Sequence, residues 1–267
     1  MRTSEGVVLV YFVYLLVAAW FRPLPPARRW RVAIAAVCAC GIVGVTAAVG
    51  PMWFRDWMPL AYVLAGYRLS GLFFVTPALE FEAHLAAADR RLFAGLDLPR
   101  RLEQAPRLVL EYLEAVYFAT PAFLPAGLVV VLWAGRPDLV EWYWTTVLLA
   151  EFGAFAVLPW VPTRPPWMIE PVGAIDRRHL SVRRFSRRVS GPLVIGWNTF
   201  PSGHASGALA ISIAVFAASP AAGVVGLMLT LSVVVASVVG RYHYGPDAAA
   251  GLALGGLAAL VAELLVR

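Results

Sequence analysis

Long runs of apolar residues alternate with short polar stretches along most of the chain. About 20 apolar residues in helical conformation cross the hydrocarbon core of a bilayer, and seven runs are predicted to do so. The predicted spans are 7–21, 32–49, 108–133, 139–161, 204–218, 222–239 and 248–266. An eighth run, 58–76, contains Pro59 and Arg68, so it is expected either to span or to be re-entrant or interfacial.

Two polar segments separate these runs. Residues 79–106 predict one or two amphipathic helices with a break near Gly95 and Pro99. Residues 162–200 form a polar loop that contains seven arginines. We therefore expect three regions. They are an N-terminal transmembrane hairpin (1–55), a hydrophobic and amphipathic connecting region (56–106), and a catalytic transmembrane core that includes the polar loop (107–267).

The composition agrees with a membrane protein. Hydrophobic residues make up 60% of the chain and charged residues 14%, whereas soluble domains contain about 25% charged residues. The fold class predicted from the pattern is an all-α, polytopic membrane bundle with seven or eight spans. The two cysteines, Cys38 and Cys40, lie in one apolar run, so no disulfide framework and no zinc site is expected.

All basic side chains other than histidine are arginine, and the formal net charge is +6. In a chain this apolar, the bilayer and anionic lipid or phosphate are expected as partners rather than nucleic acid. Guanidinium groups bind oxyanions in bidentate fashion, so a phosphate site here would be built from arginine. The candidate headgroup contacts in the polar loop are Arg177, Arg178, Arg183 and Arg184.

Three short motifs lie at the ends of predicted spans. They are PTRPPW (162–167), PSGH (201–204) and GRYHYGPD (240–247). The chain crosses the membrane out and back between the second and third motifs. Counting spans therefore places all three on one membrane face, whichever way the protein is oriented.

The PSGH motif suits an anion site beside a proton-transfer group. Thr199 or Ser202 can cap the following helix, whose first N–H groups then point at the ligand. Gly203 lets a phosphoryl oxygen approach the backbone, since it has no Cβ. The imidazole of His204 can give and take protons near neutral pH.

His243 and Asp247 are four residues apart in the third motif. Within one helical turn the carboxylate can hold Nδ1–H of the imidazole, which leaves Nε2 as a free nucleophile. Pro246 allows this arrangement if a helix starts near Tyr244. Together with the guanidinium groups of Arg164 and Arg241, these side chains can stabilise a phosphoryl-transfer transition state without a metal or another cofactor.

The three motifs resemble the phosphatidic acid phosphatase type 2 superfamily, over about residues 85–260. PSGH matches the second family motif and HYGPD the core of the third. The stretches RPPW and ADRRLFAGLDLP are most similar to the inositol phosphorylceramide synthase-like (inositolphosphotransferase) branch. Val157 stands where the family has a lysine, which makes pyrophosphate substrates less expected. Ser237 stands where it has an arginine, and we infer that Arg241, one helical turn further on, takes over that contact.

The resemblance implies an acid phosphatase and vanadium haloperoxidase-like catalytic core that acts on a membrane lipid or polyprenyl phosphate. His243 would form a phosphohistidine, oriented by Asp247, while His204 would protonate the leaving group and deprotonate the acceptor. The phosphoryl oxygens would be bound by Arg164, Arg241, Ser202 and Gly203. Water as acceptor gives a phosphatase, and an alcohol such as inositol gives a phosphotransferase.

Other functions and the orientation stay open in the sequence. A non-catalytic binder or transporter of anionic lipids would use the arginines but would not need a histidine held by an aspartate. A haloperoxidase is less expected, because those enzymes are soluble. The chain is expected in the cell membrane, and the resemblance implies an extracytoplasmic site, whereas the four arginines of residues 21–31 favour a cytoplasmic loop there. No pattern indicates an oligomeric state.

Overall fold

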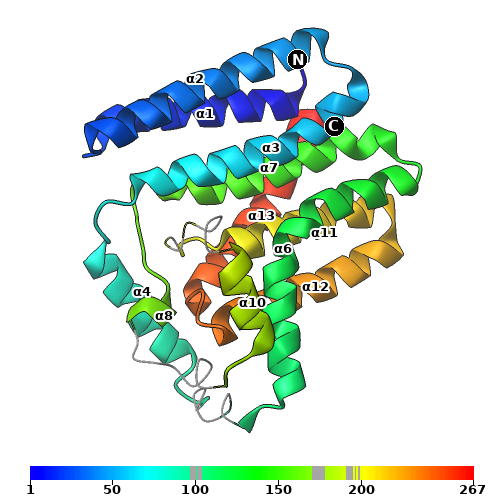
Figure 1. Ribbon diagram of the computed structural model, residues 1–267. Helices are drawn as coiled ribbons and strands as arrows, with labels where there is room; N and C mark the ends of the chain where they lie inside the picture. Colours follow the sequence, from blue (N-terminus) through cyan, green and yellow to red (C-terminus); the bar gives the residue numbers. More distant parts are fainter. Residues whose placement is uncertain (97–100, 102–103, 170–177, 191–194, 196, 198) are drawn as a thin grey trace.

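The computed structural model describes residues 1–96, 101, 104–169, 178–190, 195, 197 and 199–267, and within these it contains helices and no strand (Figure 1). Five of the described helices are long and apolar enough to cross a membrane. They are α1 (Thr3–Phe21), α2 (Pro26–Val49), α6 (Arg107–Trp133), α12 (Pro220–Val239) and α13 (Gly245–Val266). The predicted all-α membrane bundle is therefore confirmed, whereas the predicted number of seven or eight spans is not.

Three further helices run alongside these five without meeting the same criterion. They are α3 (Met52–Ser70), α7 (Val140–Val157) and α11 (Gly203–Ala218). The last is apolar but has only 16 residues. Both α7 and α11 lie inside the bundle, where most of their residues are buried. The uncertain eighth run is a helix that ends in a 3-10 turn, Gly71–Phe73, and it packs along α7.

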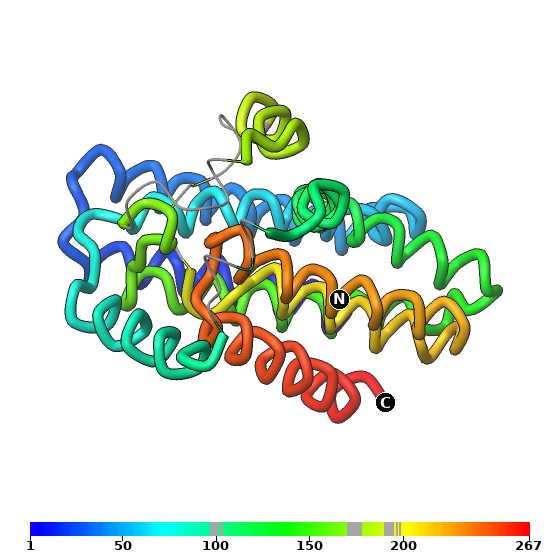
Figure 2. Tube along the Cα trace, turned by 90° about the horizontal axis from the view of Figure 1, so that it is seen from below, coloured from blue at the N-terminus to red at the C-terminus, as the bar shows by residue number. Residues whose placement is uncertain are grey.

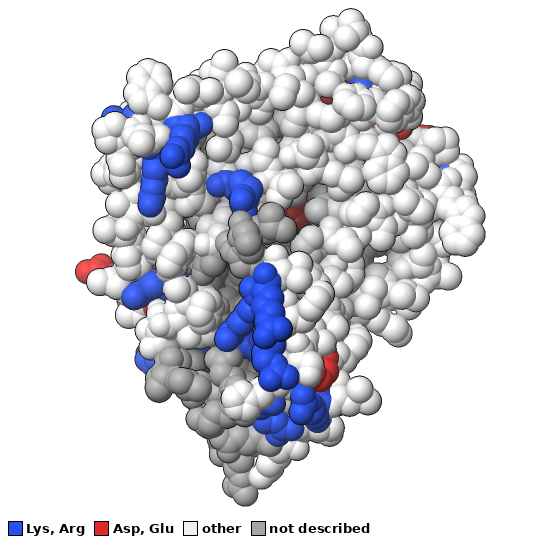
Figure 3. All heavy atoms as spheres, in the orientation of Figure 1, with Lys and Arg blue, Asp and Glu red and all other residues white. Residues whose placement is uncertain are grey.

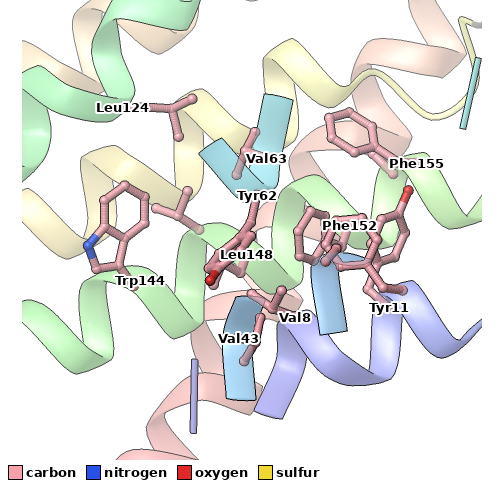
Figure 4. Close-up of a cluster of buried hydrophobic side chains, with 14 of the residues drawn as sticks. Val8, Tyr11, Val43, Tyr62, Val63, Leu124, Trp144, Leu148, Phe152 and Phe155 are labelled. Atoms are coloured by element: carbon pink, nitrogen blue, oxygen red, sulfur yellow. The ribbon is translucent and has the colours of Figure 1, made fainter. Parts of the chain in front are cut away.

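The main hydrophobic core lies where the α1–α2 hairpin meets α3 and α7 (Figure 4). Tyr11 of α1 stacks on Phe152 of α7 with ring centroids 4.0 Å apart. Val8, Leu15 and Leu148 in the same cluster are fully buried. Many large apolar side chains on the outer faces of α1, α2, α12 and α13 are exposed instead. A bilayer would cover such faces, as expected for an integral membrane protein.

The bundle has two chemically different ends. At one end the chain termini lie near the 3-10 turn Pro137–Leu139, since Ser4 N–H donates to Glu141 at 2.8 Å. At the other end the α1–α2 turn meets the residues that follow α7 (Figure 1). There the Arg22 guanidinium lies 5.2 Å above the Trp160 ring. The arginine-rich α1–α2 turn and the PTRPPW motif therefore occupy the same end.

Three shorter helices flank that second end, and they are α4 (Leu79–Leu92), α8 (Pro166–Ile169) and α10 (Ser181–Ser190). The amphipathic helix predicted from residue 79 is present as α4. It ends at Leu92, just before the expected break near Gly95, whereas Pro99 falls outside the described residues. Figure 2 shows α10 outside the bundle next to α6. Arginine side chains gather in the region of α10 in Figure 3.

Small residues bring α11 and α13 into close contact. A Cβ on Gly255 would lie 2.6 Å from the carbonyl oxygen of Ser206, and a Cβ on Gly251 would clash with the Ser202 carbonyl. The first turn of α11 is consequently fixed against α13. This places the PSGH and GRYHYGPD motifs side by side.

Candidate active site

The three motifs are joined by hydrogen bonds of the backbone. Ser202 N–H donates to the Asp247 carbonyl at 3.0 Å, which links the second motif to the third. Trp167 N–H donates to the Arg241 carbonyl at 3.1 Å, which links the first motif to the third. The motifs that the sequence predicts on one face therefore form one connected structure.

The hydroxyl of Thr163 completes these connections. It accepts hydrogen bonds from the backbone N–H groups of Thr199 and Phe200 at 3.1 and 3.3 Å, and the Thr199 hydroxyl lies 2.9 Å away. Thr163 and Thr199 are both buried. Thr163, the residue before Arg164, thus fixes the segment that leads into PSGH.

The two histidines face each other across the site. His204 lies in the first turn of α11, and His243 lies in the turn between α12 and α13. Their ring centroids are 6.0 Å apart with planes at 60°. His243 is buried, with 4% of its surface exposed, whereas His204 is partly exposed. The two imidazoles are therefore close enough to act on the same substrate.

The partner of His243 differs from the one expected. Nδ1 of His243 lies 2.9 Å from the carbonyl oxygen of Thr199, and the nearest Asp247 oxygen is 3.7 Å away. The reason is that α13 begins only at Gly245, so His243 precedes the helix and the one-turn spacing is not formed. Asp247 instead accepts the Tyr244 N–H at 2.9 Å and caps α13. Pro246 sits in the first turn, as expected.

Nδ1 of His243 must carry its proton in order to donate to the Thr199 carbonyl. Nε2 then holds the lone pair, and its predicted role as the nucleophile stays a prediction. The fully buried Asp247 carboxylate remains close enough to stabilise a positive charge on the His243 ring.

Ser202 and Gly203 differ in their roles at the start of α11. Ser202 is the N-cap, and its hydroxyl accepts the Ala205 N–H at 3.3 Å, as predicted. A Cβ on Gly203 would lie 3.3 Å from Phe155 and 3.7 Å from Glu151, both on α7. The missing side chain of Gly203 therefore serves the packing of α11 on α7.

Arg164 is held by a carboxylate of α4. Its side chain makes a bidentate pair with Glu82, at 2.8 Å between Nη2 and Oε2, and its backbone N–H donates to the same carboxylate at 2.6 Å. The hydrogen bond that Arg164 donates to Glu82 raises the pKa of its guanidinium. Glu82 is buried, whereas 32% of the Arg164 side chain is exposed. The guanidinium is thus both fixed and accessible.

Arg241 is held in the same way by a second α4 carboxylate. Its Nη1 lies 3.1 Å from Oδ2 of Asp89, whose Oδ1 accepts the Gly245 N–H at 2.7 Å. Gly240 terminates α12, and Arg241 adopts a left-handed backbone with φ of 59°. The helix therefore ends before Arg241, so Arg241 does not share a helix face with Ser237.

The match to known families falls on these elements. Residues 83–261, more than half of the chain, match the model of the PAP2 superfamily. The chain belongs to the PAP2 superfamily. Comparisons with curated proteins and with solved structures found no match. Membership and the apolar helices together indicate a membrane phosphatase-type enzyme.

The PAP2 match includes all three motifs and most of α4, whereas α1, α2 and α3 lie outside it. The carboxylates that hold the two motif arginines therefore belong mainly to the family region, because Asp89 lies within the match and Glu82 lies one residue before it. The resemblance to the inositol phosphorylceramide synthase-like branch stays a prediction.

The four arginines expected to contact headgroups are placed differently from one another. Arg184 is exposed on α10, as a headgroup contact requires. Arg178 donates to the Ala105 carbonyl at 2.9 Å, and Arg177 lies outside the described residues. Arg183 is 3% exposed and pairs with Glu114 at 2.8 Å, which corrects its expected position at the headgroups. The ion pair with Glu114 on α6 holds the Arg183 side chain inside the protein.

Several side chains at this PAP2 site were not singled out from the sequence. Glu82 and Asp89 lie seven residues apart on α4, and the buried Leu85 between them marks the same helix face. That spacing was available as a signal, since polar residues in phase with a buried one lie on the inner face. Within the described residues, no group of three His, Cys, Asp or Glu side chains is placed to hold a metal ion.

Glu151 lies in none of the three motifs, but its carboxylate is near the start of α11. A Cβ on Gly207 would clash with its carboxylate, and Gly203 lies on the same face of α11. The two glycines therefore make room for a carboxylate of α7. This explains the small residues at Gly203 and Gly207 without a contact between helix backbones.

Proposed function

We propose that this protein is a membrane phosphoryl-transfer enzyme that acts on a lipid or polyprenyl phosphate through a phosphohistidine on His243. One observation carries the proposal. The Nδ1 atom of His243 is 2.9 Å from the Thr199 carbonyl, so Nε2 is the free nitrogen, and His204 faces it across 6.0 Å. A nucleophile and a proton-transfer group at this separation suit in-line transfer of a phosphoryl group.

In the first step the lone pair of Nε2 of His243 attacks phosphorus, and the bond from phosphorus to the lipid oxygen breaks. His204 gives its proton to the leaving alkoxide. In the second step His204 takes a proton from the acceptor hydroxyl, whose oxygen attacks phosphorus while the phosphorus–nitrogen bond breaks. The enzyme returns to its starting protonation state.

The arginines and Asp247 supply the electrostatic part. The guanidinium groups of Arg164 and Arg241 would bind the phosphoryl oxygens, and the α4 carboxylates hold them in place. Gly203 would add its N–H at the start of α11, whereas the Ser202 N–H is bound to the Asp247 carbonyl. The Asp247 carboxylate would stabilise the positive charge that develops on His243. These groups balance charge without a metal ion.

The acceptor is water in a lipid phosphatase and an alcohol in an inositolphosphotransferase. The resemblance to the inositol phosphorylceramide synthase-like branch supports an alcohol. It also supports an extracytoplasmic site in the cell membrane. The opposite orientation is favoured by the arginines of the α1–α2 turn, which lies at the same end of the bundle as the site.

The test is turnover by purified protein in detergent with a panel of lipid phosphates, with and without inositol or glycerol. Phosphate release or transfer to the alcohol is expected, together with inhibition by vanadate and full activity in a chelator. His243→Ala is expected to abolish turnover, and His204→Ala to lower it by about 10²–10⁴-fold. Radiolabelled substrate is expected to leave acid-labile phosphate on the wild type and not on His243→Ala.

The competing function is binding or transport of anionic lipids. In that case His243→Ala would still transport lipid, and the wild type would neither release phosphate nor label. That result would refute the proposed phosphoryl-transfer activity.

A further inference from the structure

A stack of rings stands behind His204, on the side away from the bundle core. The ring of Tyr117 stacks on the His204 imidazole at 4.5 Å with planes at 15°. Tyr242 stacks on the other face of Tyr117 at 4.3 Å with planes at 4°. The Arg183 guanidinium lies 4.9 Å from the Tyr242 ring centre. We call His204, Tyr117, Tyr242 and Arg183 the column.

The far end of the column is fixed by Glu114. Its carboxylate accepts the Tyr242 hydroxyl at 2.7 Å and an Arg183 N–H at 2.8 Å. Arg183 also donates to the Gly240 carbonyl at 3.0 Å. The Glu114 and Arg183 side chains are each only 4% exposed. Buried, charge-assisted hydrogen bonds of this kind hold their groups in one geometry.

The column joins His204 of α11 to three other parts of the chain. Glu114 and Tyr117 are three residues apart on α6, so they lie on one face of that helix. Tyr242 comes from the turn that carries His243, and Arg183 comes from α10 in the polar loop. The loop is therefore linked to the catalytic turn through Glu114.

His204 depends on this column for its orientation. No hydrogen bond to a ring nitrogen of His204 is found in the described part of the chain. The second rotatable bond of a histidine side chain has broad minima, so this bond alone does not fix the plane of the ring. The stacked Tyr117 ring is the contact that does. Stacking fixes the plane of a ring and leaves its edge free. Both nitrogens thus stay available for proton transfer while the ring is held by its face.

We propose that Tyr117 is a positioning residue, which holds the His204 imidazole in the orientation that delivers a proton to the leaving group, with Tyr242, Arg183 and Glu114 fixing Tyr117 from behind. This inference rests on the proposed function. Tyr117 also contacts His243, with ring centroids 6.4 Å apart and planes at 63°. The aromatic ring of Tyr117 makes the stacking contact, and the phenol hydroxyl is not needed for it.

The experiment compares two leaving groups in Tyr117→Leu, Tyr117→Phe and wild type. An alkyl phosphate needs a proton on its leaving oxygen, whereas p-nitrophenolate leaves without one. Tyr117→Leu is expected to lower kcat for an alkyl lipid phosphate about 100-fold, with KM changed less than about threefold, because general acid catalysis contributes about 10²–10⁴-fold. Its burst of p-nitrophenolate from p-nitrophenyl phosphate is expected within about threefold of wild type. Tyr117→Phe keeps the ring and is expected to match wild type in both.

Equal losses for both leaving groups in Tyr117→Leu would overturn the proposal, because a general structural defect does not depend on the leaving group. A loss in Tyr117→Phe as large as in Tyr117→Leu would overturn it too. If Tyr117→Leu does not fold, Tyr242→Phe decides, since it removes only the hydrogen bond to Glu114. It is expected to lower alkyl phosphate turnover several-fold and leave the burst unchanged, and equal losses again overturn the proposal.

The failure of this inference is distinct from failure of the proposed function. If the wild type shows neither turnover nor phosphohistidine, the proposed function fails. If the wild type is active and the variants lose both substrates alike, only the role of Tyr117 fails.

Discussion

Two helices bring charged side chains to the same end of the bundle. Helix α4 contributes acids that pair with arginines, whereas α10 contributes an arginine that pairs with an acid. The inner face of α4 carries Glu82 and Asp89, which hold the motif arginines Arg164 and Arg241. From α10, Arg183 reaches an acid of α6, Glu114. In the first case the structure supplies acids to arginines of the site, and in the second it supplies an acid to an arginine outside it.

Exposure distinguishes the two arrangements. The Arg164 and Arg241 side chains are 32% and 13% exposed, whereas Arg183 and Glu114 are each 4% exposed. A partly exposed guanidinium can exchange one oxygen partner for a phosphoryl oxygen, whereas a fully buried pair cannot do so without leaving a charge unpaired. The α4 pairs thus suit ligand binding, and the α10 pair suits the fixing of structure.

The largest effect is expected from breaking the buried pair. Glu114→Gln removes the buried carboxylate that pairs with the Arg183 guanidinium and should lower the free energy of unfolding by about 3–5 kcal/mol. Thermal or denaturant unfolding in detergent measures this. Asp138→Asn, at an exposed pair with Arg136, is the matched control and should leave the midpoint unchanged. Equal midpoints for the two variants would contradict the distinction drawn from burial.

A smaller loss is expected on α4. In Asp89→Asn one oxygen must replace two, so either Arg241 or the Gly245 N–H loses its acceptor. The expected decrease in the free energy of unfolding is about 1.5–3 kcal/mol, the range for hydrogen bonds to charged groups. Glu80→Gln on the exposed face of the same helix is the control and should be neutral. A neutral Asp89→Asn would show that α4 does not hold Arg241.

The accessible arginine should affect activity more than folding. Arg164→Lys keeps the positive charge but loses the fork that fits both Glu82 and a phosphoryl group, so kcat/KM should fall by about tenfold or more. Steady-state rates on the best lipid phosphate of the panel measure this. Arg136→Lys, at the exposed pair with Asp138 on the opposite end of the bundle, is the control. Equal rates in the two variants would remove Arg164 from the phosphate site.

The mildest test changes neither stability nor rate. Arg90→Cys on α4 and Arg184→Cys on α10, in a Cys38→Ala/Cys40→Ala background, should react with an impermeant maleimide from one side of the membrane. Asp138→Cys, at the opposite end of the bundle, should react from the other side. Labelling of Arg90→Cys and Arg184→Cys from different sides would refute the shared end, and the side that is labelled gives the orientation.

Much of the bundle was predictable because its signals are local. The run 222–239 predicts α12 nearly to its bounds, and the run 32–49 predicts the end of α2 but not its start at Pro26. An apolar helix in lipid satisfies its own backbone hydrogen bonds, which makes such runs informative. The cap at Ser202 and the first-turn proline at Pro246 also follow from neighbouring residues. The prediction of one helical turn from His243 to Asp247 failed, because the helix start at Gly245 is set by the Asp247 cap.

The roles of the arginines were less predictable. Arg183 and Arg184 are neighbours of the same type, yet one is buried and the other exposed. Glu114, which decides between them, lies 69 residues away in sequence. Asp89 and Arg241 are 152 residues apart. Such pairs have no local pattern, because their geometry arises only when separate helices pack.

The sequence by itself determined the membrane bundle, the shared face of the three motifs and the residue types at the site. These follow from hydrophobic periodicity and from the chemistry of neighbouring residues, which need no distant contacts. Only the tertiary structure decided which arginine stays accessible, which face of His204 is stacked, and that the Thr199 carbonyl holds Nδ1 of His243. Every residue carries such a carbonyl, so its choice leaves no mark in the sequence and depends on how the chain is brought together.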